Sequence, residues 1–329
     1  NYFGGAQDNS TTFRDKSGML GPVVSDSNDH YIVLGGDGCQ VGMTKKNAEG
    51  NQFLFCAAQS GQIYRMKLFD FSNNLYTLIR PTGSAEGEFI TYFHLDPDNT
   101  DFLYYVSKNS IYRTGNAATV SASNWTLMDG INTNVTGSIF ALATTRGPYT
   151  ANNHLFIGTS SGKVYRLKDP QWGAASNQPS DITPSGMTAG SVVRDIAVNP
   201  RNQDTVMAVV SNYGVNSIFW TGNATAAVPT WQVAEGNLSL PSVRACEIIA
   251  KTTGIEYYVG TSIGLYSTTT INGASTVWAK ETGAAGTPAA MMNDAIINSL
   301  AHRWTDNTMV VGTHGNGMFA ASLGSPITI

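Results

Sequence analysis

Short apolar runs, each followed by a small-residue turn and a second apolar run, recur along the whole chain. Successive copies are 47 to 54 residues apart, measured between the aromatic residues that open the second runs: Phe13, Tyr64, Tyr112, Tyr165, Phe219, Tyr266 and Phe319. A period of about 40–50 residues is typical of a four-stranded antiparallel blade. The pattern therefore predicts seven hairpins, at residues 2–14, 53–66, 102–114, 154–167, 205–221, 256–267 and 308–320.

Further strands are expected on both sides of the hairpins. Apolar runs precede five of them, at residues 89–95, 138–143, 192–198, 243–250 and 296–302, and Trp125, Trp172, Trp231 and Trp278 are expected to begin short outer strands. Many runs, such as residues 205–210, are apolar at successive positions, as expected where both faces of a sheet are covered. We predict an all-β protein, a seven-bladed β-propeller of four-stranded blades whose first blade is incomplete at its N-terminal side.

Length and composition set limits on the organisation and on the partners. A propeller of this size is one domain, so residues 1–329 are expected to form a single domain, as part of a longer protein with other domains. Only 13% of residues are charged and the net charge is −4 without a basic block, so nucleic acid is a poor partner. No apolar run approaches the roughly 18–20 residues of a membrane span. We expect no cofactor and no metal site.

The three cysteines have no metal-binding spacing. Cys39 and Cys56 flank one hairpin and could form a disulfide in an oxidising compartment. The alternative, which we favour, is that Cys56 and Cys246 are buried strand residues.

The motifs resemble those of a known group of propellers. The segment Gly4-Gly5-Ala6-Gln7-Asp8-Asn9, the Gly-Thr-Ser hairpin turns and the Pro-containing turns at residues 96–101 and 199–204 resemble the sortilin-like and BNR-repeat (Asp-box) propellers of the secreted bacterial type. The Asp box itself is eroded, because residues 267–278 keep Gly273 and Trp278 but have Asn272 where Asp is expected. Kelch repeats are the alternative family. The resemblance implies a secreted or cell-surface protein.

Arginines occur in two kinds of position. Arg14, Arg65, Arg113 and Arg166 follow the hairpin aromatic, and a residue that recurs at one repeat position is expected to be structural. Three others, Arg146, Arg194 and Arg244, lie near the first strands and could reach a pocket.

Acidic residues away from the common repeat positions are candidates for hydrolysis. A glycosidase needs two carboxyl groups about 5–9.5 Å apart. Asp195 and Glu247 lie in first strands, which line the channel of a propeller, so they could converge, although they could equally pair with the neighbouring Arg194 and Arg244. The remaining acidic candidates are Asp8, Asp37, Glu88 and Asp294.

The hairpin turns are expected to emerge on one face and to offer amide, hydroxyl and aromatic side chains, which suit neutral sugars or peptide backbone. We predict a non-enzymatic binding module for a protein or polysaccharide ligand on this face. The alternatives are a glycoside hydrolase of the xyloglucanase or sialidase-like type and a structural spacer in a large adhesin or secretion assembly. The predicted binding residues are Asp8, Asn9, Asn212, Tyr213, His314 and Asn316.

Overall fold

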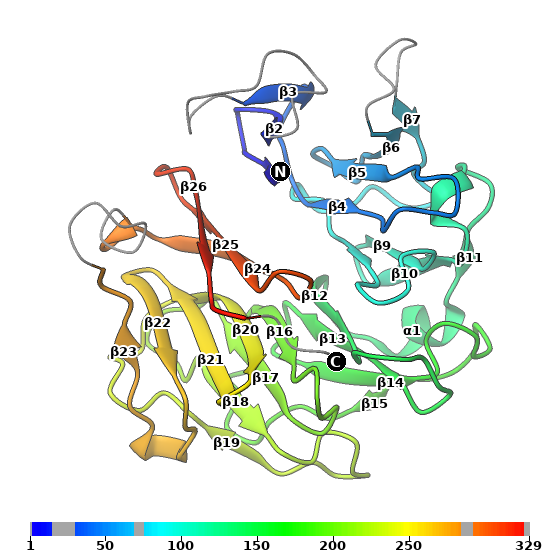
Figure 1. The fold of residues 1–329 in the computed structure, drawn as a ribbon. Helices are drawn as coiled ribbons and strands as arrows, with labels where there is room; N and C mark the ends of the chain where they lie inside the picture. Colours follow the sequence, from blue (N-terminus) through cyan, green and yellow to red (C-terminus); the bar gives the residue numbers. More distant parts are fainter. Residues whose placement is uncertain (1, 15–29, 69–75, 284–291, 326–329) are drawn as a thin grey trace. The chain divides into compact units, whose positions relative to one another are not determined.

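The computed structural model describes residues 2–14, 30–68, 76–283 and 292–325. This part of the chain folds into seven antiparallel sheets, each made from strands that are consecutive in sequence (Figure 1). Five of these sheets have four strands, and the first and last have three. The predicted all-β fold with seven repeats is therefore confirmed. The described residues contain no helix long and apolar enough to cross a membrane.

Each sheet follows the chain in order. The sheets are β1 (Tyr2–Gly5), β2 (Thr11–Arg14) and β3 (Tyr31–Leu34); β4 (Val41–Met43), β5 (Phe53–Ala57), β6 (Ile63–Lys67) and β7 (Tyr76–Leu78); β8 (Phe93–Leu95), β9 (Leu103–Ser107), β10 (Ser110–Thr114) and β11 (Thr126–Leu127); β12 (Ile139–Thr144), β13 (His154–Thr159), β14 (Val164–Lys168) and β15 (Ser180–Asp181); β16 (Val193–Val198), β17 (Val206–Val210), β18 (Ile218–Thr221) and β19 (Trp231–Val233); β20 (Val243–Lys251), β21 (Gly254–Thr261), β22 (Gly264–Thr268) and β23 (Ala279–Lys280); and β24 (Ile297–Arg303), β25 (Thr308–Thr313) and β26 (Met318–Ser322). The helical elements are α1 (Asp129–Asn134), η1 (Ala117–Thr119) and η2 (Gly273–Ser275).

The chain forms two compact units. Unit 1 comprises Asn1–Asn134 and Ala174–Asn177, and unit 2 comprises Val135–Gly173 and Gln178–Ile329. Within unit 1, the first strands β4 and β8 are neighbours, and within unit 2 the first strands β12, β16, β20 and β24 are neighbours in that order.

All seven predicted hairpins are present: β1–β2, β5–β6, β9–β10, β13–β14, β17–β18, β21–β22 and β25–β26. Four predicted first strands agree with β12, β16, β20 and β24 to within about one residue at each end. The fifth begins later than predicted, at Phe93, and Phe89 is exposed. The short strand β4 was not predicted, because its sequence Val-Gly-Met gives almost no apolar signal.

The core lies between neighbouring sheets, which explains the continuous apolar runs. Along β17, Val206, Ala208 and Val210 pack into a cluster with β12–β14 and β16. The alternate residues Met207 and Val209 face the opposite way, into a cluster with β20 and β21. Both faces of this central strand are therefore covered, as predicted.

The repeated Gly-Thr at the end of the second strand has a packing cause. A Cβ atom on Gly158 would lie 2.5 Å from Val193 Cγ1, and one on Gly260 would lie 2.6 Å from Ile297 Cγ2. The first strand of the following sheet thus comes too close for any side chain at these two positions.

Three of the four predicted outer-strand tryptophans join adjacent sheets. In each case the indole N–H donates to the backbone carbonyl group of the residue that follows the outer strand of the preceding sheet. The pairs are Trp125 to Ile79, Trp231 to Ile182 and Trp278 to Ala234, each at 2.8 Å. The prediction is wrong for Trp172, which is 70% exposed, and the outer strand of that sheet begins at Ser180. A polar loop separates this tryptophan from its strand.

Candidate functional site

The four neighbouring first strands of unit 2 share an irregularity at their N-terminal ends. In each of these strands, the pairing with the second strand of the same sheet skips the second residue. In β16, for example, Val193 pairs with Val210 and Asp195 pairs with Val209. Such a bulge leaves one residue without a cross-strand partner and changes the direction of its side chain. The four residues, which we call the bulge residues, are Phe140, Arg194, Arg244 and Asn298.

The bulge residues contact one another from strand to strand. The Arg194 guanidinium lies over the Phe140 ring, with Cζ 6.0 Å from the ring centroid. Arg244 Nη1 donates to Asn298 Oδ1 at 3.1 Å, and its Nε donates to Ser242 Oγ at 3.2 Å. Burial lowers the pKa of Arg194; the charge of Asp195 opposes this shift and the charge of Arg244 adds to it. The two arginines are therefore close enough to repel each other.

The bulge residues lie at the end of the sheets where the hairpin turns emerge. In all four sheets the first turn residue donates its backbone N–H to the carbonyl just before the first strand: Ser160 to Ser138 at 2.8 Å, Ser211 to Val192 at 3.1 Å, Ser262 to Ser242 at 2.9 Å and His314 to Ile296 at 2.8 Å. The turns and the bulge residues of unit 2 thus form one surface, which we call the bulge surface.

Four of the predicted binding residues belong to these turns. Tyr213 is 62% exposed, and His314 and Asn316 are also exposed. Asn212 is half-buried, and its Oδ1 accepts the backbone N–H of Val192 at 2.7 Å, so this side chain also fixes its turn. Their role in binding remains a prediction.

The other two predicted binding residues, Asp8 and Asn9, lie in the β1–β2 turn of unit 1 and are exposed. The backbone N–H of Asp8 donates to Asp37 Oδ1 at 2.7 Å. Asp37 therefore fixes this turn.

Asp195 and Glu247 lie on the neighbouring strands β16 and β20, both half-buried. Asp195 accepts two backbone N–H groups, Ile196 through Oδ1 and Cys246 through Oδ2, each at 2.9 Å. The second bond joins two sheets, so this carboxylate has a structural role whether or not it has a chemical one.

The surroundings of the two carboxyl groups separate their pKa values. Burial raises the pKa of Asp195 to about 6, against the opposing effects of the two backbone N–H groups and the charge of Arg194. Burial raises the pKa of Glu247 to about 8; the charge of Arg146 opposes this shift and the charge of Asp195 adds to it. Glu247 is therefore the weaker acid of the pair, and Asp195 loses its proton first as the pH rises. The charge of Asp195 acts on Glu247, and a catalytic role for the two acids stays a prediction.

An aromatic cluster surrounds Arg146, beyond the end of β12. The Arg146 guanidinium lies over the Trp304 ring, with Cζ 5.1 Å from the centroid. The His302 ring meets the same indole edge-on, with the centroids 4.2 Å apart, and its Nε2 is 2.7 Å from Asn307 Oδ1. Burial lowers the pKa of His302, so this imidazole is neutral at pH 7.

The remaining candidates have structural partners. Arg65 Nη1 donates to the Val120 carbonyl at 2.7 Å and Arg166 Nη1 to that of Ala226 at 2.9 Å, which confirms a structural role for these two repeat-position arginines. Asp294 forms an ion pair with Lys280. Glu88 lies in the irregular segment before β8 and is half-buried.

All three cysteines are free thiols, so the Cys39–Cys56 disulfide considered from the sequence is not formed. Cys56 in β5 and Cys246 in β20 are buried, as predicted. Burial raises the pKa of the Cys56 thiol to about 12, and an inert packed residue is expected there.

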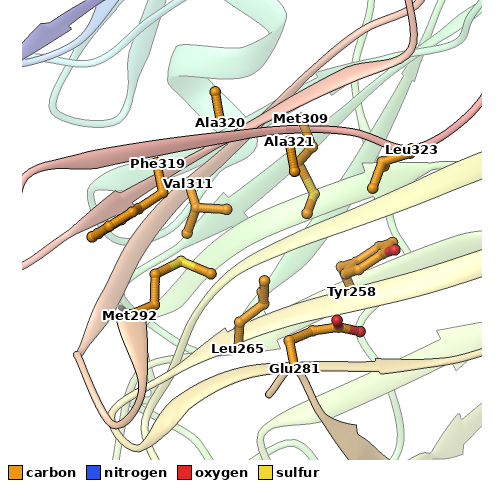
Figure 2. Close-up of a pocket in the computed structure, with 10 residues that line it drawn as sticks. All are labelled: Tyr258, Leu265, Glu281, Met292, Met309, Val311, Phe319, Ala320, Ala321 and Leu323. Carbon is orange, nitrogen blue, oxygen red and sulfur yellow. The ribbon is translucent and has the colours of Figure 1, made fainter. Parts of the chain in front are cut away.

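A small pocket lies between the last two sheets of unit 2 (Figure 2). Its volume is about 70 Å³, and most of its lining is aliphatic or aromatic, with Leu265, Met292, Met309 and Phe319 among the contributors. It opens between packed sheets away from the bulge residues, none of which lines it. We regard this pocket as a packing gap.

Comparison with known proteins identifies the fold. No family model matches the chain, and no curated protein matches it. Among solved structures, the chain is similar to the GH74 xyloglucanase from Xanthomonas campestris, with a TM-score of 0.62 and 11% identity over 97% of this chain and 50% of that one. The chain thus spans half the length of that protein. Together with the seven sheets, this similarity confirms the predicted seven-bladed β-propeller.

Proposed function

We propose that the protein is a non-enzymatic binding module that takes a polysaccharide on the bulge surface. The observation that carries this proposal is the recurrence of a bulge at one position in four neighbouring strands, with side chains that contact one another. Bulges are conserved structural devices that often re-aim side chains beside functional sites. Binding residues also tend to lie where loops converge on a rigid scaffold.

A carbohydrate ligand suits the side chains at this surface. The amide of Asn298 provides hydrogen-bonding groups, and the exposed ring of Tyr213 provides a stacking face. His314 and Asn316 are exposed at the rim of the same surface. The protein of similar fold is named for its action on xyloglucan, a polysaccharide. The resemblance of the motifs to secreted BNR-repeat and sortilin-like propellers supports a secreted or cell-surface location and a single propeller domain over residues 1–329.

Hydrolysis is the second candidate function, and the pair Asp195 and Glu247 favours it. Two carboxyl groups whose surroundings separate their pKa values are the usual arrangement of a general acid and a base or nucleophile. Glu247, with a pKa of about 8, is the candidate acid. Because Asp195 is already hydrogen-bonded to two backbone N–H groups, we place binding first.

One experiment separates these functions. Titration calorimetry with a panel of neutral and acidic polysaccharides measures binding, and an assay of new reducing ends in the same tubes measures hydrolysis. We expect binding without release, and we expect Tyr213→Ala to weaken binding by at least about fivefold, the effect of losing an aromatic contact. Tyr76→Ala, at an exposed tyrosine in unit 1, is the matched control.

Two other outcomes would contradict the proposed binding module. Reducing ends that disappear in Glu247→Gln would establish the hydrolase in place of the binding module. A protein that binds no polysaccharide in the panel would contradict both functions.

A further inference from the structure

The two arginines of the bulge surface are placed to act together. Arg194 and Arg244 occupy the same position in neighbouring strands, and each is the residue that the bulge turns out of the regular ladder. A guanidinium group presents its N–H donors as a planar fork that matches oxyanions such as carboxylate or sulfate. Two guanidinium groups at the same end of adjacent strands can bind one oxyanion together.

Among the described residues, the hydrogen bonds of Arg244 do not compensate its charge. Its two hydrogen bonds go to neutral oxygen atoms, Ser242 Oγ and Asn298 Oδ1. These bonds hold the side chain in place without neutralising it. A positioned guanidinium whose hydrogen bonds go to neutral groups is preorganised for an anion.

Two arginines that interact electrostatically lie on this surface of a protein whose net charge is −4. The charge of Asp195 attracts Arg194, and the charge of Arg244 repels it. An anion between the two arginines would remove their mutual repulsion, because like charges nearby disfavour the charged forms.

We propose that Arg194 and Arg244 form a subsite for an oxyanion substituent of the polysaccharide, either the carboxylate of a uronic acid or a sulfate ester. This inference rests on the proposed polysaccharide-binding function and specifies the chemical class of the ligand. The neutral bulge residues Phe140, on β12, and Asn298, on β24, contact the guanidinium groups of Arg194 and Arg244 respectively.

The test uses three polymers and matched variants. Dextran is the neutral probe, dextran sulfate carries sulfate esters and polygalacturonate carries carboxylates, and each is titrated into the chain by calorimetry at fixed salt. We expect one or both anionic polymers to bind at least tenfold more tightly than dextran, and the tighter one identifies the oxyanion. Arg244→Gln should lower that affinity about tenfold, with Arg244→Lys falling between.

The control is Arg201→Gln. Arg201 is exposed in the turn after the same strand β16, at its opposite end, and donates to the Lys251 carbonyl at 3.1 Å. It carries the same charge away from the bulge surface, so its loss should change the affinity less than twofold. Thermal melts of each variant, with Arg244→Lys as the conservative substitution, separate lost binding from lost folding.

Distinct outcomes overturn the two proposals. Equal binding of dextran and the anionic polymers, or equal effects of Arg244→Gln and Arg201→Gln, would overturn the oxyanion subsite and leave the binding module standing. If none of the polymers and none of the wider panel binds, both proposals fail.

Discussion

At the scale of single residues, Glu247 has an unusual protonation state. Burial and the charge of Asp195 raise its pKa to about 8, and Arg146 opposes that shift only in part. An unfolded glutamate has a pKa near ~4.3. Between these two values the folded state binds a proton that the unfolded state does not, so stability falls as the pH rises through this window. Above pH 8 the ionised Glu247 carboxylate therefore lowers the free energy of unfolding.

We predict that Glu247→Gln stabilises the protein at pH 8.5 and leaves its stability nearly unchanged at pH 4. The gain should be about 1–3 kcal/mol, since each unit of pKa shift corresponds to ~1.4 kcal/mol and the group retains some contact with solvent. Urea unfolding at the two pH values measures the difference. The control is Glu49→Gln, at an exposed glutamate. A loss of stability in Glu247→Gln at pH 8.5 would contradict the assigned pKa.

At the scale of strands and sheets, the tryptophan bridges fix neighbouring sheets to one another. Trp278 is 2% exposed, and its indole N–H donates to the Ala234 carbonyl of the preceding sheet. Trp278→Phe keeps most of the apolar surface but leaves a buried carbonyl without this donor, which costs ~1–3 kcal/mol. Thermal or urea unfolding should show that loss. Trp172→Phe, at a side chain 70% exposed, should change stability by less than ~0.5 kcal/mol, and equal effects of both variants would contradict the bridging role.

The same scale shows what the sequence can and cannot predict. The hairpins were predictable because each places both strands and their turn within about 15 residues, and the pattern repeats seven times. The bulges were not, because Arg194 and Arg244 look like ordinary strand residues until the register with the second strand is known. Asp195 was predictable as a first-strand acid, but its bond to Cys246 on another sheet depends on how the sheets pack. Trp172 was assigned wrongly because an inserted loop separates it from the strand.

At the scale of the whole molecule, the distribution of charge is the property that links structure to the proposed function. The chain is acidic overall, with a net charge of −4, yet Arg194 and Arg244 lie at the same end of two neighbouring first strands of unit 2, and Arg146 follows the opposite end of β12. The charge of Asp195 acts on Arg194, and Glu247, whose pKa burial raises further than that of Asp195, interacts with Arg146 and Asp195. When Glu247 loses its proton near pH 8, a second negative charge appears beside Asp195.

We therefore predict that affinity for an anionic polysaccharide falls roughly three- to tenfold between pH 7 and pH 9, because a second negative charge then appears next to Asp195, the neighbour of Arg194. Calorimetric titrations at both pH values and constant salt measure the change. Glu247→Gln should bind as tightly at pH 9 as at pH 7, since the amide does not ionise and Asp195 is already ionised at both. Raised salt should weaken binding in both proteins, because screening acts on the arginines themselves. An affinity that falls equally with pH in Glu247→Gln and in the unmodified protein would place the responsible titration elsewhere, and would separate Glu247 from the bulge surface.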